Sequence, residues 1–335
     1  MIDMVGEVYV SVKANVLKKL EENRGFFFSG EELAASLTVS RAAVWKAIKQ
    51  LEEEGYHIDA VPNKGYCLAT NNDLVSVEGI RTYLRGSNKG LELHVDKVTE
   101  STNKDAKLAA INNGKHGEVF VALEQTAGRG RRGRSFISMK GNSIYMSIIL
   151  KPNMNSNNVV LITTAASVAV HRAITKVTGK ITQIKWVNDL YYQERKICGI
   201  LTEAVTDCES GMIDSIILGI GINFNTNEEN IPEELQGIVG ALYQGDSGNI
   251  TRNELIAEII NQVLQLCSNL DDISFLEEYR NYSMILGKEI MVIGYEEPKP
   301  AKALQIMDNG GLLVVYSDGR QEVLCTGEVS IRINK

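Results

Sequence analysis

The residues Ser29–Leu68, SGEELAASLTVSRAAVWKAIKQLEEEGYHIDAVPNKGYCL, decide the fold of the N-terminal part of the chain. Apolar residues within Gly30–Leu37 recur at helical spacing, which predicts a short helix. After a tight break at Thr38-Val39, Ser40 is a good N-cap for a second helix that reaches about Glu54. The stretch therefore predicts two helices joined by a tight turn.

A hairpin and a further helix complete this unit. The residues on either side of Pro62-Asn63-Lys64-Gly65 alternate in polarity, which predicts two short strands, and Lys13–Glu22 has helical spacing. Helix, short helix, turn, helix and hairpin is the order of elements in a winged helix-turn-helix. We therefore expect residues 1–70 to form a DNA-binding domain.

The net charge of residues 1–70 does not by itself indicate DNA binding, because ten Asp and Glu outnumber eight Lys and Arg. Several basic residues nevertheless gather on the second helix of the pair and on the hairpin. Trp45, on the same helix, fits a core as well as it fits a DNA contact. The residues predicted to contact DNA are Ser40, Arg41, Trp45, Lys46, Lys49 and Lys64.

Strands and helices alternate from residue 76 to residue 285, after a polar link at residues 71–75. Several of the strands are almost continuously apolar, so at least one face of their sheet is expected to be covered. The predicted strands are Glu118–Leu123, Ser143–Leu150, Ile181–Val187, Ile197–Val205 and Ser215–Ile222, and the main helices are Val159–Thr178, Arg252–Ser268 and Asp271–Tyr282.

The C-terminal residues 287–335 have a different pattern, of five short strands separated by turns. Asp308-Asn309-Gly310-Gly311 and Ser317-Asp318-Gly319-Arg320 are strong hairpin signals. Short strands so closely spaced predict a small SH3-like barrel. The chain is therefore expected to be an α+β protein of three domains, at residues 1–70, 76–285 and 287–335.

The composition bounds the classes of protein that this chain can be. Its 335 residues are 44% hydrophobic and 23% charged, with a net charge of −7, and no apolar run approaches the length of a membrane span. Five scattered cysteines, none in a C-x-x-C pair, argue against a disulfide framework or a zinc site. With no pattern of a signal peptide at the start, we expect a cytoplasmic protein.

The strongest chemical signal is Gly128–Phe136, GRGRRGRSF, in which three glycines interleave four arginines. Guanidinium groups bind carboxylates and phosphates through paired hydrogen bonds, and glycines let the backbone approach a ligand. No Gly-Lys-Ser/Thr follows, so the loop is not a Walker loop. From composition alone, a solvated basic loop or an RNA-binding patch remains open.

Three weaker signals accompany the arginine loop. Lys185-Trp-Val-Asn-Asp189 ends an apolar stretch, where Asn-Asp suits either a turn or a carboxylate facing Mg²⁺, and Lys196 begins the next strand. Ser101-Thr102-Asn103 precedes a helical stretch, where helix capping is the first interpretation. Gly219-Ile-Gly-Ile-Asn223 ends a strand, where its glycines suit either packing or a flat ligand.

Together these motifs resemble those of the biotin–protein ligases, and closely those of the bifunctional kind that also represses the biotin operon. The resemblance covers nearly the whole chain, and its most specific parts are Gly128–Arg134, Lys185-Trp-x-Asn-Asp189, Lys196-x-x-Gly-Ile-Leu-x-Glu203 and Gly219-x-Gly-x-Asn223. It implies a biotin-ligase-like mixed sheet, related to that of class II synthetases, in the central domain.

The resemblance also implies a function. The family converts biotin and ATP to biotinyl-5′-AMP with Mg²⁺ and transfers biotin to a lysine of a biotin carboxyl carrier protein. Its bifunctional members bind operator DNA as homodimers promoted by biotinyl-AMP. The alternatives are a lipoate–protein ligase, whose fold is related, and a ligand-sensing repressor that has lost catalysis.

The family's functional positions fall on residues of this chain. The implied biotin contacts are Ser101, Thr102, Asn103, Gln125, Gly128, Arg129, Gly130, Arg131, Lys196 and Gly199. The implied ATP contacts are Arg131, Arg134, Phe136, Lys185, Asn188 and Asn223, the magnesium ligand is Asp189, and the catalytic residues are Lys196, Arg131 and Arg134. Two positions depart from the family: Phe136 replaces its usual Trp, which reduces the area for adenine stacking, and Val187 replaces its usual Pro, which leaves that turn less restricted.

Overall fold

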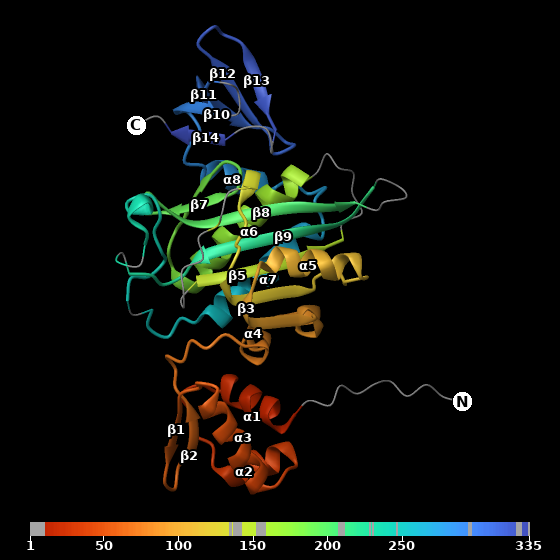
Figure 1. The fold of residues 1–335 in the computed structure, drawn as a ribbon, viewed down its shortest axis with the longest axis vertical. Coiled ribbons are helices and arrows are strands. Elements are labelled where there is room, and N and C mark those ends of the chain that lie inside the picture. Colours follow the sequence, from red (N-terminus) through yellow and green to blue (C-terminus); the bar gives the residue numbers. More distant parts are fainter. Residues whose placement is uncertain are drawn as a thin grey trace, which may run out of the picture. The chain divides into compact units, whose positions relative to one another are not determined.

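The computed structural model describes residues 11–133, 136, 143–151, 159–206, 212–227, 229, 231–245, 247–293, 297–325 and 330–333 (Figure 1). The chain divides into two compact units. One consists of residues 1–84 and 248–257, and the other of residues 85–247 and 258–335. This division into two units does not test the three domains predicted from the sequence, which stay a prediction.

The first unit begins with a three-helix core, formed by α1 (Val12–Glu21), α2 (Gly30–Leu37) and α3 (Arg41–Glu53). The predicted apolar faces are buried, and they include Val16, Leu20, Leu33, Val44, Ile48 and Leu51. Thr38, at φ 55°, ends α2 in the left-handed region, and the Ser40 hydroxyl accepts a hydrogen bond from the Ala43 N–H at 3.2 Å. The tight turn between two capped helices is thereby confirmed.

Strands β1 (Ile58–Val61) and β2 (Gly65–Leu68) form the predicted hairpin, with Asn63 at φ 65° in its turn. A bridge between Phe28 and Tyr66 attaches the hairpin to the segment before α2. The winged helix-turn-helix predicted from Ser29–Leu68 is confirmed.

The polar link at residues 71–75 makes several hydrogen bonds to other residues of the same unit. The two Asp73 carboxylate oxygens accept from the Arg252 backbone N–H at 2.6 Å and from its Nε at 2.7 Å. The Asn253 Nδ2 donates to the Leu74 carbonyl at 2.9 Å. Arg252 and Asn253 are buried at the start of α7 (Arg252–Cys267), and the link leads directly into α4 (Val77–Tyr83).

The second unit contains a mixed seven-stranded sheet, as the family resemblance implied. The strand order is β3-β4-β5-β9-β8-β7-β6, in which β3 and β4 are parallel and every other pair is antiparallel. The strands are β3 (Leu93–Thr99), β4 (Val119–Gln125), β5 (Ser143–Leu150), β6 (Gln183–Lys185), β7 (Asp189–Tyr192), β8 (Arg195–Thr206) and β9 (Ile213–Asn223).

Helices α5 (Thr102–Ile111) and α6 (Val159–Thr178) cover opposite faces of this sheet. Thr202 of β8 shares a hydrogen bond with Thr163 of α6 at 2.8 Å, whereas its neighbour Glu203 accepts one from Asn103 of α5. Consecutive residues of a strand point to opposite faces, so the two helices do as well. Helix α6 is long and apolar enough to cross a membrane, but 72% of its most apolar window is buried in the fold, as in a core helix.

Short helices and a second sheet complete the unit. Helix α8 is Phe275–Asn281, and short 3₁₀ helices lie at Gly86–Gly90, Arg131–Gly133 and Glu233–Leu235. The second sheet is antiparallel, in the order β13-β12-β11-β10-β14, as expected of an SH3-like barrel. Its strands are β10 (Glu289–Ile293), β11 (Lys299–Ile306), β12 (Leu312–Tyr316), β13 (Gln321–Leu324) and β14 (Ser330–Ile333).

Candidate functional site

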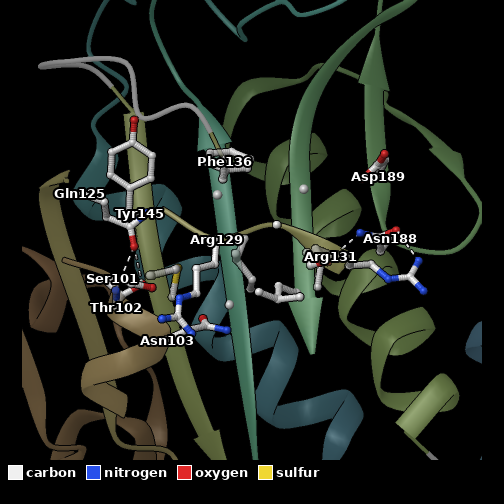
Figure 2. Close-up of a pocket in the computed structure, with 18 of the residues that line it drawn as sticks. Ser101, Thr102, Asn103, Gln125, Arg129, Arg131, Phe136, Tyr145, Asn188 and Asp189 are labelled. Atoms are coloured by element: carbon white, nitrogen blue, oxygen red, sulfur yellow. Dashed lines mark hydrogen bonds between the residues drawn. The ribbon is translucent and has the colours of Figure 1, made fainter. Parts of the chain in front are cut away.

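A cavity of about 190 Å³ lies on the face of the large sheet that α5 covers (Figure 2). Most of its side chains come from the N-terminal end of α5 and from strands β4, β5, β8 and β9. The described residues that line it are Ser101, Thr102, Asn103, Gln125, Arg129, Gly130, Arg131, Phe136, Tyr145, Met146, Asn188, Asp189, Lys196, Gly199, Ile200, Leu201, Gly219, Ile220 and Gly221.

One end of the cavity is polar, and Arg129 is the charged side chain that lies there among the described lining residues (Figure 2). The Gln125 Oε1 accepts from the Thr102 backbone N–H at 2.9 Å and from its hydroxyl at 3.2 Å. Ser101, Thr102 and Asn103 are all buried, and Figure 2 shows them grouped with Gln125 on one side of the cavity. With Oε1 occupied by Thr102, the Gln125 amide offers its N–H groups to a ligand.

The other end carries charged groups. The Lys196 Nζ lies 2.8 Å from Asp189 Oδ1, and the Arg131 Nη1 donates to Asn188 Oδ1 at 3.3 Å. Asn188 is itself held in place by Ile200. The Asn188 side-chain Nδ2 donates to the Ile200 backbone carbonyl at 2.7 Å, and the Asn188 backbone carbonyl accepts from the Ile200 N–H at 2.9 Å.

Two cations, Arg131 and Lys196, lie with the carboxylate of Asp189 at this end, and a third cation, Arg129, lies beside Asn103 at the other end (Figure 2). This excess of positive charge favours an anionic ligand at the charged end.

The turn before Asp189 is held by contacts with its surroundings, although it has Val187 where the family usually has a proline. The buried Val187 carbonyl accepts from the Tyr279 hydroxyl at 3.1 Å and from the Ser167 hydroxyl at 3.3 Å. The Trp186 indole N–H donates to the carbonyl of Gly310, in the turn between β11 and β12, at 2.9 Å. These contacts supply the restriction that a proline would otherwise give.

Glycines and one aromatic ring lie between the two ends of the cavity. A Cβ atom at Gly221 would lie 2.6 Å from the Phe136 Cζ, and one at Gly199 would lie 3.3 Å from the same ring. The Phe136 N–H donates to the Gly128 carbonyl at 2.9 Å, which ties together the two ends of the arginine loop. The ring therefore lies against backbone that carries no side chain, as Figure 2 shows for Phe136 over the central strands.

Three buried titratable groups near the cavity keep their protons at neutral pH. Burial, and then the charge of Asp189, raise the pKa of Tyr191 to about 12. Burial likewise raises the pKa of the Cys198 thiol and of the Tyr279 hydroxyl, so both keep their protons. No histidine is among the described residues that line the cavity. The positive charges of Arg131 and Lys196 are groups of this site that can stabilise developing negative charge.

Most of the residues implied by the family resemblance meet in this one cavity. They are Ser101, Thr102, Asn103, Gln125, Arg129, Gly130, Arg131, Phe136, Asn188, Asp189, Lys196 and Gly199. Gly128, Lys185 and Asn223 are not in its lining, and Arg134 lies outside the described residues. Lys185 lies 5.6 Å from the centre of the Tyr191 ring, and the buried Asn223 donates to the Gly240 carbonyl at 2.9 Å.

Sequence reasoning missed several lining residues, which are Tyr145, Met146, Ile200, Leu201 and Ile220. All five belong to apolar strands and carry no motif of their own. The only signal was alternation along β5, β8 and β9, because Tyr145 and Leu201 share a face with Gly219 and Gly221.

The residues predicted to contact DNA all lie on the surface of the first unit. Trp45 is 56% exposed on α3, so the core position that its sequence also allowed is wrong. Lys49 pairs with Glu52 at 2.6 Å, and the Lys64 ammonium lies 5.8 Å from the centre of the Phe27 ring at the hairpin. Arg41 and Lys46 are exposed beside Trp45 on the same helix.

Comparisons with protein families match both units. Residues 95–223 match the biotin/lipoate A/B protein ligase family, and residues 13–67 match a helix-turn-helix domain. The chain is 33% identical to the bifunctional ligase/repressor BirA of Bacillus spizizenii over an alignment of 321 residues, and the match covers 93% of this chain and 97% of that one. It is 30% identical to the bifunctional ligase/repressor BirA of Escherichia coli, covering 92% and 94% of the two chains.

A solved structure agrees with these relatives. The biotin protein ligase from Aquifex aeolicus in complex with biotin and ATP aligns with a TM-score of 0.63 and 28% identity. The alignment covers 72% of this chain and 99% of that one. The resemblance found in the motifs is therefore confirmed over both the helix-turn-helix and the large sheet.

Proposed function

Because this chain belongs to the family of bifunctional biotin ligase/repressors, it attaches biotin to protein with ATP and represses transcription, and we propose that biotin and ATP react in the cavity of Figure 2. The observation that carries this assignment is that Arg131 and Lys196 lie at one end of a cavity whose other end offers neutral polar groups beside Arg129. A ligand with an anionic end and a neutral polar end matches that arrangement.

The orientation of biotin follows from its two ends. Its carboxylate must approach the ATP phosphates, so it belongs near Lys196 and Arg131. The ureido group then falls at the end that holds Gln125, where the Gln125 N–H groups can donate to its carbonyl oxygen. We assign Ser101, Thr102, Asn103 and Gln125 to biotin on this ground.

The first reaction step joins two anions. One carboxylate oxygen of biotin attacks the α-phosphorus of ATP, the bond from that phosphorus to the bridging oxygen of the β-phosphate breaks, and pyrophosphate leaves. The carboxylate is ionised at neutral pH, so no base is required. Lys196 and Arg131 offset the repulsion and stabilise the negative charge that builds up on the phosphoryl oxygens.

The second step transfers biotin to the acceptor. The amine of a lysine of the carrier protein attacks the carbonyl carbon of biotinyl-AMP, the bond from that carbon to the phosphate oxygen breaks, and AMP leaves. The amine loses its proton to solvent. We propose that Phe136 and the arginine loop cover the intermediate, since exclusion of water would protect a reactive mixed anhydride.

A magnesium ion fits the charged end of the cavity. Asp189 is the one carboxylate among the described lining residues, and its Oδ1 is engaged by Lys196. A single carboxylate suits Mg²⁺, which keeps several waters and shares phosphate oxygens, better than it suits a metal held by protein alone. We assign Asp189 to this ion, whose charge would help to neutralise the triphosphate.

The helix-turn-helix unit supplies repression, for which we propose the exposed face of α3 as the DNA-reading surface. Arg41, Trp45 and Lys46 are exposed there, and Lys64 lies on the hairpin. One helix offers few base contacts, so we propose a homodimer that reads two half-sites and is promoted by biotinyl-AMP. We place the protein in the cytoplasm, where its carrier and DNA would both be found.

Pyrophosphate release tests the proposed function against its alternatives. The protein is incubated with ATP and Mg²⁺ and with biotin, lipoate or neither acid. We expect release that depends on biotin. Release with lipoate but not with biotin would favour a lipoate ligase, and no release with either acid would favour a repressor without catalysis.

A further inference from the structure

A chain of hydrogen bonds leads from the cavity wall to a carboxylate that the proposed chemistry does not use. Asn103, the second residue of α5, is buried and donates from Nδ2 to the Glu203 Oε2 at 2.7 Å. Its Oδ1 accepts from the hydroxyl of Ser147, a fully buried residue of β5, at 2.7 Å. The two ends of the amide are therefore held by β8 and β5, the strands on either side of β9.

Gly219 makes this bridge possible. In the sheet, Gly219 of β9 lies between Ser147 of β5 and Leu201 of β8. A Cβ atom at Gly219 would lie 2.0 Å from Asn103 Oδ1, far inside contact distance. The Asn103 amide thus lies directly against the backbone of β9, which only a glycine allows at this position.

Glu203 determines which way the amide points. A carboxylate can only accept, so the Asn103 Nδ2 must face Glu203 and the Asn103 Oδ1 must face Ser147. Amide oxygen and nitrogen are similar in size, so without that acceptor the group could turn over with little steric cost. The carboxylate therefore fixes the Asn103 carbonyl as a hydrogen-bond acceptor.

The fixed amide orders the hydroxyl groups of Ser147 and Thr102. Ser147 has one hydroxyl proton and two oxygens within reach, Asn103 Oδ1 at 2.7 Å and Thr102 Oγ1 at 2.8 Å. Because the Asn103 oxygen can only accept, it takes the Ser147 proton. The Thr102 hydroxyl then keeps its own proton for Ser147 or for the Gln125 oxygen, which the Thr102 backbone N–H also holds.

We propose that Glu203 is a positioning residue for the biotin end of the cavity. It is not among the residues that line the cavity, and it acts through the chain from Asn103 to Ser147 and Thr102. The inference rests on the proposed function, since it concerns how the cavity binds biotin.

Steady-state pyrophosphate release by the full chain tests this role, with biotin and ATP varied separately. Glu203→Ala should raise the KM for biotin about tenfold, the scale of one lost hydrogen bond to a charged group, and leave the KM for ATP and kcat within about twofold. Glu203→Gln keeps a carbonyl oxygen that can accept from Asn103, so its KM for biotin should stay within about threefold of wild type.

A reciprocal exchange gives the sharper test. Asn103→Asp places a second carboxylate against Glu203, so the KM for biotin should rise further than in Glu203→Ala. Adding Glu203→Gln to that variant supplies a donor for Asp at position 103 and restores a 103–203 hydrogen bond. The KM for biotin of the double variant should be at least about tenfold lower than that of Asn103→Asp alone. A merely structural role predicts the same KM for biotin in both variants.

Thr202→Val is the matched control, because it removes the hydrogen bond to Thr163 on the opposite face of the same strand. It should leave the KM for biotin unchanged. If wild type releases no biotin-dependent pyrophosphate, the proposed function itself fails. If wild type is active but Glu203→Ala keeps the wild-type KM for biotin, the positioning role is overturned. If Glu203→Ala does not fold, the exchange decides, and absence of recovery in the double variant overturns the role.

Discussion

Replacing Lys196 by alanine should slow adenylate formation by about 10²-fold or more, the usual scale for one preorganised electrostatic donor. The Lys196 Nζ lies 2.8 Å from Asp189 Oδ1, and the two side chains are 31% and 23% exposed. An ion pair so close to solvent contributes only about 0–1 kcal/mol to stability. Removing it should therefore cost catalysis far more than folding.

Single-turnover formation of biotinyl-AMP, with thermal unfolding measured in parallel, separates these two effects. Lys115→Ala is the control, because it removes a lysine that is also paired with a carboxylate, Glu92 at 3.2 Å, outside the cavity lining. We expect a near-normal rate for the control and near-normal unfolding temperatures for both variants. A Lys196→Ala protein that forms biotinyl-AMP at the wild-type rate would remove this lysine from the mechanism.

Three further predictions concern the arginine loop, Gly221 beneath the Phe136 ring, and the coupling of biotin activation to operator binding. Arg131→Gly should release biotinyl-AMP faster, measured as labelling of bystander lysines, and unchanged leakage would mean that another group holds the phosphate. Gly221→Ala should raise the KM for ATP about tenfold without a similar rise for biotin, because its Cβ would lie 2.6 Å from the Phe136 ring; equal effects on both substrates would contradict adenine stacking there. Biotin with ATP should tighten both dimerisation, measured by sedimentation, and operator binding, and an adenylate that alters neither would refute the coupling.

The fold was predictable where one periodicity dominates a segment. Gly30–Leu37, Ser143–Leu150 and Val159–Thr178 have the predicted bounds, because each is capped, strongly apolar or both. Strand β3 was missed because its residues Asp96, Lys97 and Val98 are exposed at the sheet edge and show no alternation of a buried face. Strand β7 was missed because Asn188-Asp189 is typical of a turn, and the strand that begins there has only four residues.

The site was predictable where residue types are chemically unusual for their setting, as in the arginine loop. It was not predictable where the decisive fact is a contact across the sheet. Nothing near Gly219 in the sequence indicates that Asn103 lies against it, and nothing near Ser147 indicates that its hydroxyl meets both Thr102 and Asn103. Such contacts follow from strand order, which local periodicity does not contain.

The central claim, that biotin and ATP are joined through a carboxylate attack on the α-phosphorus, is tested most directly with biotin labelled by ¹⁸O in its carboxylate. The chain is incubated with this biotin, ATP, Mg²⁺ and a carrier protein, and the nucleotide product is analysed by mass spectrometry. The attacking oxygen stays on phosphorus when the lysine amine displaces AMP, so we predict one ¹⁸O atom in each AMP released. Unlabelled AMP, or label in pyrophosphate, would contradict the mechanism.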